Sequence, residues 1–143
     1  MIGTHQNGLI KLNIENQEFK NIIYKSNESS SLLVNSIAKS LDNKFFIGTN
    51  HGLMIYDQYA ETMELAKFDL SSKYEKITKS IESIIIDRQN TIWLGTSQKG
   101  LIKISRNNDF YQIDKLEITK KRILSLSLKE NGNILCGTEN DGL

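Results

Sequence analysis

Proline is absent from this chain of 143 residues, cysteine and tryptophan occur once each, and histidine occurs twice. The lack of proline excludes no fold class by itself. The single cysteine, Cys136, excludes an intramolecular disulfide and a zinc site built from cysteines. Because Cys136 stands in a short apolar run, we expect its side chain to pack as a small hydrophobic group.

Long apolar runs and a leader-like start are also missing. No stretch approaches the roughly 18 continuous apolar residues of a membrane-spanning helix. The first residues, Met1-Ile2-Gly3-Thr4, lack the charged region followed by an apolar one that marks a signal peptide. We therefore expect no membrane contact by this segment.

Charge of one sign does not dominate, since there are 18 basic and 17 acidic residues. A protein that neutralises a nucleic-acid backbone usually needs a basic face. Lys120, Lys121 and Arg122 form only a short basic step, which we interpret as a solvated loop. No nucleic-acid partner is expected, and the hydrophobic fraction of 38% is that of an ordinary globular protein.

The sequence does contain an internal repeat. Three stretches, 36–50, 83–97 and 125–139, align without insertion, and in each a serine stands twelve residues before a glycine. Successive glycines lie 45, 47 and 42 residues apart, counting from a partial unit at the start. This regular spacing is the signature of a repeat architecture. The Gly-Thr pairs are Gly3-Thr4, Gly48-Thr49, Gly95-Thr96 and Gly137-Thr138, and the Gly-Leu pairs that follow them are Gly8-Leu9, Gly52-Leu53, Gly100-Leu101 and Gly142-Leu143.

Each unit predicts two antiparallel strands joined by a tight turn. The serine opens an apolar run that is too short and too β-branched for a helix. Five residues before the Gly-Thr glycine stands Asn43, Asn90 or Gly132, and these residue types tolerate the positive φ of hairpin turns. The closing glycine would weaken a strand unless a neighbouring strand or repeat unit crowds the backbone there.

A third strand follows each Gly-Leu pair, and a fourth, more variable strand completes the unit. Four short antiparallel strands per 42 to 47 residues is the period of a β-propeller blade. Helical repeats do not fit, because no stretch of about 12 residues keeps a 3.6-residue pattern. Residues 71–83 could hold a helical turn or simply link two blades. The third strands are expected at 9–12, 53–56 and 101–104, and the fourth strands at 19–24, 63–68 and 110–113.

We therefore predict an all-β fold made of β-propeller blades. Two full blades are expected at 35–80 and 81–122, with incomplete blades at 1–34 and 123–143. A closed propeller typically needs about four to eight blades. Because unpaired strand edges invite pairing, we expect the open blade edges to pair with the remainder of a propeller or with another copy of the chain.

One unit has a more specific pattern. Asp87 is followed by Ile92-Trp93-Leu94-Gly95-Thr96 and then by Gly100-Leu101-Ile102. This pattern resembles the two-component regulator propeller repeat, and three staggered copies and a partial one cover nearly the whole chain. The sequence departs from the family where Phe46 and Leu135 replace the tryptophan. The glycine that often precedes Gly-Leu is also replaced, in every copy.

The resemblance implies the periplasmic sensor region of a bacterial hybrid two-component sensor histidine kinase. It implies a non-catalytic, ligand-sensing module that is a piece of a larger sensor, with an oligosaccharide as ligand and no cofactor. A propeller scaffold for protein–protein interaction or dimerisation is the alternative. A lyase or hydrolase built on a propeller is a third interpretation, but no nucleophile, histidine and acid stand in a catalytic pattern.

Several single residues could serve either the ligand or the fold. Trp93 could stack on a sugar, but apolar residues occupy its position in the sister units, so packing in the core is preferred. Asp87 could be a ligand carboxylate, but its sister positions, Ser40 and Lys129, share no charge, so a turn role is preferred. The threonines of the Gly-Thr pairs are expected to bond neighbouring backbone, because a binding site is normally asymmetric.

The link between the second and third strands carries the candidate ligand-binding residues. In propellers this link shares a face with the connections between blades, and ligands often bind that face. No metal site is expected, since the two histidines have no carboxylate partner at fixed spacing. The hydrogen-bonding residues suited to a sugar or another polar ligand are His5, Gln6, Asn50, His51, Gln98 and Asn140.

Overall fold

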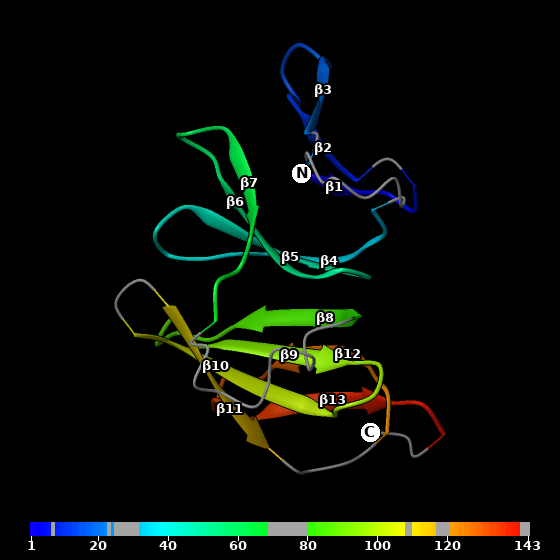
Figure 1. Cartoon of the computed structure of the whole chain (residues 1–143), viewed down its shortest axis with the longest axis vertical. Helices are drawn as coiled ribbons and strands as arrows, with labels where there is room; N and C mark the ends of the chain where they lie inside the picture. The colour runs from blue at the N-terminus through cyan, green and yellow to red at the C-terminus, as the bar shows by residue number, and fades with distance from the viewer. Residues whose placement is uncertain are drawn as a thin grey trace.

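The computed structural model of the chain describes residues 1–6, 8–22, 24, 32–68, 80–107, 110–116 and 121–140. Within these ranges the regular structure consists of strands, which form four antiparallel sheets. Figure 1 shows the N-terminal sheet at the top, the second sheet below it, and the third and fourth sheets overlapping in the lower part of the view. The prediction of an all-β chain of blades is confirmed.

Strand order within every sheet follows the order of the sequence. Such a meander is what a chain of short hairpins produces. The first sheet contains β1 (Ile2–Gly3), β2 (Leu9–Leu12) and β3 (Phe19–Ile22). The second contains β4 (Val34–Lys39), β5 (Lys44–Thr49), β6 (Gly52–Asp57) and β7 (Thr62–Leu65). The third contains β8 (Ile81–Ile86), β9 (Ile92–Thr96), β10 (Leu101–Asn107) and β11 (Phe110–Leu116), and the fourth contains β12 (Ile123–Leu128) and β13 (Ile134–Thr138).

The tight turns form where the sequence predicts them. Asn43, Asn90 and Gly132 have φ angles of 60°, 62° and 85°. Each stands in the turn between the first two strands of its sheet. Asparagine and glycine tolerate this left-handed region, and other residues rarely do. The predicted hairpin chemistry is confirmed in all three places.

Each inner hairpin carries the same irregularity. The register of β4 and β5 shifts between Val34 and Ser36, and equivalent shifts occur in the other two inner hairpins. One residue, directly before the repeat serine, is thereby left out of the ladder as a bulge. The three bulge residues are Asn35, Glu82 and Leu124.

The glycines of the first three Gly-Thr pairs lie tightly against a side chain of the next sheet. A Cβ atom added there would lie closer than 3.0 Å to a side chain of the next sheet, a separation that real Cβ atoms do not show. Only glycine fits, so the predicted crowding by a neighbouring unit is confirmed. The closest contacts of the added Cβ with the next sheet are Gly3 to Val34 at 2.5 Å, Gly48 to Ile81 at 2.7 Å and Gly95 to Ile123 at 2.7 Å.

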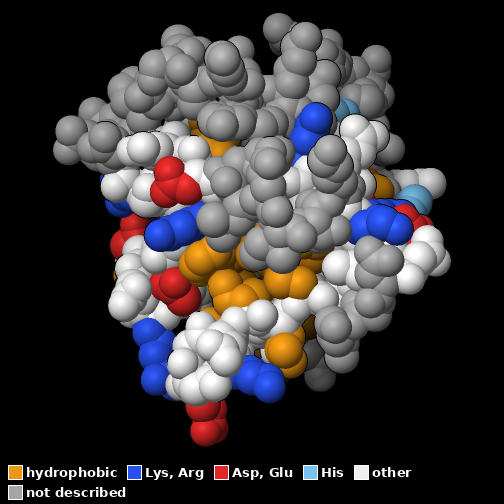
Figure 2. All heavy atoms as spheres, turned by 90° about the horizontal axis from the view of Figure 1, so that it is seen from below, with side chains coloured by type: hydrophobic (Ala, Val, Ile, Leu, Met, Phe, Trp, Pro, Cys, Tyr) orange, Lys and Arg blue, Asp and Glu red, His pale blue; other side chains and the backbone are white. Residues whose placement is uncertain are grey.

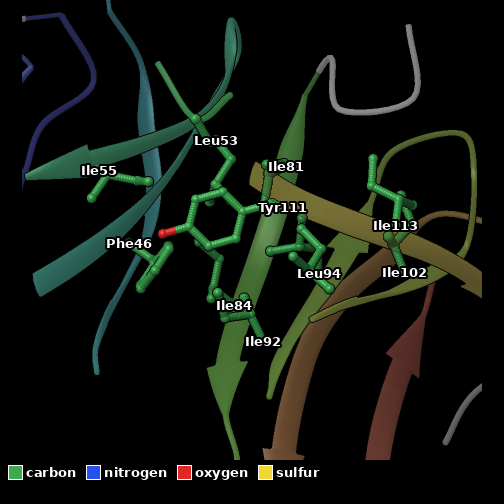
Figure 3. Close-up of a cluster of buried hydrophobic side chains, with 12 residues drawn as sticks. Phe46, Leu53, Ile55, Ile81, Ile84, Ile92, Leu94, Ile102, Tyr111 and Ile113 are labelled. Carbon is green, nitrogen blue, oxygen red and sulfur yellow. The ribbon is translucent and has the colours of Figure 1, made fainter. Parts of the chain in front are cut away.

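The main core lies between the second and third sheets. Figure 3 shows Phe46 of β5 beside the ring of Tyr111 of β11. The two rings meet edge-on, with centroids 5.8 Å apart and planes at 90°. The backbone N–H of Tyr111 also donates to the carbonyl of Lys67, at 3.0 Å, which ties the two sheets together. The buried members of this cluster are Phe46, Leu53, Ile55, Ala66, Ile81, Ile84, Ile92, Leu94, Ile102, Ile104, Tyr111 and Ile113.

A second cluster fills the space between the first and second sheets. Its buried members are Leu9, Ile22, Ile47, Met54 and Tyr56. Successive residues of β6 point alternately into the two clusters, so both faces of the second sheet are covered. This is the packing of consecutive blades.

The fourth strands differ in length from the prediction. The expected strand 63–68 is β7, which ends at Leu65, and the expected strand 19–24 is β3, which ends at Ile22. Phe68 instead makes an isolated parallel bridge to Tyr111 of the third sheet, because the chain there leaves its own sheet. The expected strand 110–113 is longer, as β11. Most of the possible helical turn at 71–83 lies outside the described residues, and 81–83 belong to β8.

Candidate ligand-binding face

Four loops built on the Gly-Thr pairs lie at one end of the strands. They connect β1 to β2, β5 to β6 and β9 to β10, and the fourth follows β13. Figure 1 shows them one above another along the right-hand side of the molecule. The repeat therefore places the loops of different blades on a common face.

The threonine of each complete loop closes its turn. The hydroxyl groups of Thr4, Thr49 and Thr96 donate to the carbonyls of Gly8, Gly52 and Gly100 at 2.9, 2.8 and 2.9 Å. Thr49 and Thr96 are fully buried and also accept backbone N–H groups of their own loops. The prediction that these threonines bond neighbouring backbone is confirmed, and the loops are held rigid.

The six predicted ligand-binding residues lie on this face with different exposure. His5, Gln6, Gln98 and Asn140 are exposed, whereas Asn50 and His51 are half-buried. The Asn50 side chain accepts the backbone N–H of Leu33 at 3.0 Å, so part of its hydrogen-bonding capacity serves the fold. The exposed four are therefore the better candidates for contact with a ligand.

A polar cluster that the sequence analysis missed lies beside these loops. Glu82, a bulge residue whose side chain is 12% exposed, pairs with the Arg122 guanidinium at 3.1 Å and lies 3.3 Å from the hydroxyl of Ser80. The pairing with Glu82 raises the pKa of Arg122 above its ordinary value. The Nε of Arg122 is buried and has no hydrogen-bond partner among the described residues. The signal that could have found this cluster is the residue directly before each repeat serine, which the bulge turns out of the ladder.

Backbone hydrogen bonds join the cluster to the loop face. In the second, third and fourth sheets, the residue after the Gly-Thr pair donates its N–H to the carbonyl of the residue that precedes the first strand of the same sheet. These bonds hold the connections between blades against the Gly-Thr loops, so both contribute to one surface. The bonds are Asn50 to Leu33 at 3.2 Å, Ser97 to Ser80 at 3.2 Å and Glu139 to Arg122 at 3.0 Å.

Trp93 and Asp87 lie at the opposite end of β9 from its Gly-Thr loop, and they contact each other. The indole Nε1 of Trp93 donates to the Asp87 carboxylate at 2.9 Å, and Lys103 lies over the ring at 5.8 Å. Asp87 also accepts the N–H groups of Gln89 and Thr91, so its predicted turn role is confirmed. Burial alone would raise the pKa of Asp87, but these hydrogen bonds outweigh it and hold the pKa below the ordinary value.

The predicted core position of Trp93 needs correction. Its sister residue Phe46 is 3% exposed, but Trp93 is only half-buried. The ring of Tyr111, from the outer strand β11, covers Phe46 edge-on at 5.8 Å. Cys136 of β13 is likewise half-buried, and burial raises the pKa of its thiol.

Other candidate sites are weaker. Among the described residues no group of three or more His, Cys, Asp and Glu side chains could hold a metal ion. Nor does the described part of the chain contain a helix long and apolar enough to span a bilayer. A hollow of about 570 Å³ lies at the β2–β3 hairpin, away from the Gly-Thr loops. It is lined by Lys11, Asn13, Gln17, Glu18, Phe19 and Lys20.

One repeat unit of the chain matches a known protein family. Residues 76–98 match the family of the two component regulator propeller. No curated protein matches the chain. Because the family match covers only 23 residues, the sequence from 76 to 98, it identifies one repeat unit.

Solved structures agree with the fold. The extracellular domain of BT4673, a proposed hybrid two component system of B. thetaiotaomicron, superposes with a TM-score of 0.74 at 23% identity over 95% of this chain. That of BT3049, another proposed hybrid two component system of B. thetaiotaomicron, gives a TM-score of 0.67 at 19% identity over 98%. The chain spans 18% and 17% of the lengths of those two domains. The chain is thus a set of β-propeller blades that carries a two component regulator propeller repeat.

Proposed function

We propose that this chain is a non-catalytic, ligand-sensing part of the extracytoplasmic region of a hybrid two-component histidine kinase. The observation that carries the proposal is the two component regulator propeller match at residues 76–98. The fold shared with extracellular domains of BT4673 and BT3049 supports both the sensing role and the location, by analogy. Kinase chemistry would belong to other domains.

The ligand in this proposal is a carbohydrate bound at the Gly-Thr loop face. His5, Gln6, Gln98 and Asn140 carry hydrogen-bond donors and acceptors, which match the hydroxyl groups of a sugar. The Thr96 hydroxyl holds the loop of Gln98 and the Thr4 hydroxyl holds the loop of His5 and Gln6, so little conformational entropy would be lost when these residues bind a ligand. Rigid polar loops from several blades suit a ligand that spans more than one of them.

Titration calorimetry of neutral and acidic oligosaccharides against the chain tests this proposal. A variant with alanine at His5, Gln6, Asn50, His51, Gln98 and Asn140 should lose at least tenfold in affinity. The matched control has alanine at Gln58 and Gln89, which are exposed residues in turns at the other end of the strands. This control should bind as the unmodified chain does. Unchanged binding by the six-residue variant would refute the site, and the failure of every oligosaccharide to bind would refute the ligand class.

A scaffold for protein–protein contact is the second candidate function. The observation that favours it is apolar exposure on the N-terminal sheet, where Ile2, Leu12 and Phe19 are 45%, 40% and 71% exposed. Contact through that sheet would leave the Gly-Thr loop face open, because the loops lie at the ends of the strands. The two functions are therefore compatible.

A further inference from the structure

The turn between β12 and β13 contains a pair of residues that the sister turns lack. The pair Asn131-Gly132 corresponds to Asp42-Asn43 in the second sheet and to Gln89-Asn90 in the third. An asparagine side chain can react with the backbone nitrogen of the residue that follows it. A following glycine leaves that nitrogen unobstructed, because glycine has no side chain. The turn of the fourth sheet is therefore chemically different from its two counterparts.

The structure leaves this pair open to water. Asn131 and Gly132 are both exposed, and beyond the chain neighbours of Gly132 no heavy atom lies within 4 Å of the place where a Cβ would stand. Asp42 and Gln89 are also exposed, although their sheets have four strands each. The exposure is therefore a property of this turn in every sheet, and it does not depend on how many strands the fourth sheet has.

The Asn131 side chain is folded back over the turn. Its Oδ1 accepts the backbone N–H of Asn133 at 3.1 Å, which forms an Asx turn around Gly132. This bond keeps the side-chain amide beside the Gly132 backbone, and it places a donor at the oxygen that gains negative charge when the amide carbon is attacked. The Gly132 N–H itself donates to the Lys129 carbonyl at 3.0 Å. Attack by the nitrogen therefore requires one exposed hydrogen bond to open, which costs little in a surface turn.

We propose that Asn131-Gly132 is a site of spontaneous covalent modification, at which the asparagine loses its amide nitrogen as ammonia. The Gly132 nitrogen gives up its proton to the solvent and bonds to Cγ of Asn131. The Cγ–Nδ2 bond breaks, the leaving nitrogen takes up a proton, and a five-membered succinimide ring remains. Water then opens the ring. Attack at the side-chain carbonyl gives aspartate, attack at the main-chain carbonyl gives isoaspartate, and no co-reactant other than water takes part.

The two products differ in how well they fit the turn. An aspartate fits, because Asp42 occupies the same position of the second sheet and its hairpin is formed. An isoaspartate adds a methylene group to the main chain. Two backbone bonds close the turn, from Gly132 to the Lys129 carbonyl at 3.0 Å and from Lys129 to the Asn133 carbonyl at 2.8 Å, and both span the added atom. Isoaspartate therefore loosens the β12–β13 hairpin, and aspartate does not.

Either product adds one negative charge to the chain. The formal net charge of +1 falls by one, to zero. Seen from below, the molecule carries side chains of both charge signs around a hydrophobic centre (Figure 2), so the lower part of the molecule, where β13 lies, already has a mixed surface. The turn stands at the end of β13 opposite to its Gly-Thr pair, and the modification therefore leaves the candidate ligand-binding face unchanged.

Tandem mass spectrometry of the 143-residue chain, kept folded at mildly alkaline pH, tests the site. Replacement of the amide by a carboxyl group raises the mass at Asn131 by about 1 Da. It should proceed at least about tenfold faster there than at Asn43, Asn90 and Asn133, because glycine alone leaves the attacking nitrogen unobstructed. Asn7 also precedes a glycine but lies outside the described residues, and it is read from its own peptide. Modification at Asn131 that is no faster than at Asn133 would overturn the proposal.

Gly132→Asn is the matched variant that keeps the turn and obstructs the reaction. Asn43 and Asn90 occupy this position in the sister turns with φ angles of 60° and 62°, so asparagine fits it. Modification at Asn131 should slow by at least about tenfold, because the new side chain stands beside the attacking nitrogen, and the circular dichroism spectrum should stay unchanged. Glu130→Ala, at an exposed position of the same turn, should leave the rate as it is. Equal rates in Gly132→Asn and in the unmodified chain would refute the attack by this nitrogen.

Urea denaturation of the separated products tests the structural consequence. Electron-transfer fragmentation identifies which chromatographic fraction of the aged chain contains aspartate and which contains isoaspartate. Freshly prepared Asn131→Asp should unfold at the same urea concentration as the unmodified chain, as the presence of Asp42 in the sister turn predicts. The isoaspartate fraction should unfold at a lower concentration. If the isoaspartate fraction and Asn131→Asp had the same midpoint, the loosening of the hairpin would be wrong.

Discussion

Gly48 lies directly against Ile81 across the boundary between the second and third sheets. A Cβ placed on Gly48 would come 2.7 Å from Cγ2 and 3.2 Å from Cβ of Ile81, and Ile81 is fully buried. The glycine at the end of one inner hairpin and the β-branched residue that opens the next sheet therefore form a matched pair. Because the same pairing joins Gly3 to Val34 and Gly95 to Ile123, it sets the spacing between successive blades.

Replacing Gly48 with alanine should destabilise the fold by about 1–3 kcal/mol, the usual cost of overpacking a core. Urea denaturation followed by circular dichroism measures the change. Ile81→Ala alone should cost about 2–5 kcal/mol through the cavity it leaves. The double variant should lose less than the sum, because the smaller side chain at Ile81 relieves the contact at Gly48. Additive losses would show that this contact does not limit the approach of the two sheets.

Thr49→Val should destabilise the chain by about 1–3 kcal/mol, although the two side chains have nearly the same shape. The hydroxyl of the fully buried Thr49 donates to the Gly52 carbonyl at 2.8 Å and accepts the His51 N–H at 3.1 Å. Valine leaves both backbone groups without this partner. Thr62→Val, at an exposed position of β7, is the control and should change the free energy of unfolding by less than about 0.5 kcal/mol. Equal effects at the two sites would refute the turn-closing role.

Much of the fold could be predicted because the repeated residues have turn and packing roles that follow from their type. Asn43, Asn90 and Gly132 mark turns that need positive φ, and each has it. The Gly-Thr glycines mark close approach between sheets. Both features can be predicted from the residue type, because asparagine and glycine tolerate positive φ and glycine has no side chain to obstruct a close contact. The lengths of β3 and β7 were less predictable, because outer strands end where contacts with the next sheet begin, as Phe68 shows.

The candidate site was only partly predictable. The spacing from the Gly-Thr pairs correctly predicted that His5, Gln98 and Asn140 lie in the loops. It could not show that the Asn50 side chain accepts a hydrogen bond from the backbone N–H of Leu33. Glu82 was missed altogether. Its position depends on a bulge, and a bulge is a register relation between two strands that no single residue type announces.

Acid should weaken the fold partly through Asp87. The pKa of this carboxyl is held below its ordinary value of 3.8 by hydrogen bonds from Trp93, Thr91 and Gln89 that outweigh its burial. A carboxyl with a depressed pKa stabilises the folded state above its unfolded pKa, and the stabilisation is lost as the pH falls through the folded value. Asp87→Asn should lower stability at pH 7 by about 1 kcal/mol and should reduce the further loss below about pH 4.

The fluorescence of Trp93 can be used to follow its hydrogen bond to Asp87 directly. Because it is the only tryptophan, its fluorescence reports on the indole that donates to Asp87. In the unmodified chain the emission should change as the pH falls through the pKa of Asp87, before the circular dichroism signal is lost. In Asp87→Asn this early change should be absent. An emission change of the same size in the variant would mean that another group near Trp93 titrates.

Two ion pairs of similar length should differ in their contribution to stability. Lys20 and Glu61 lie 2.7 Å apart with side chains 62% and 44% exposed, whereas Arg122 and Glu82 lie 3.1 Å apart with side chains 41% and 12% exposed. Water and salt screen the first pair, and exposed pairs of this kind stabilise proteins little. Removing Arg122 instead leaves the Glu82 carboxylate largely buried without its guanidinium partner.

Arg122→Ala should therefore lower the urea midpoint clearly, and Lys20→Ala should leave it nearly unchanged. Raising the salt concentration from 50 mM to 1 M should erase any effect of Lys20→Ala but should preserve most of the effect of Arg122→Ala. Arg122→Lys is the conservative variant and should restore part of the loss, since it keeps the charge but not the forked geometry. If the shorter distance governed stability, the order of the two alanine variants would be reversed.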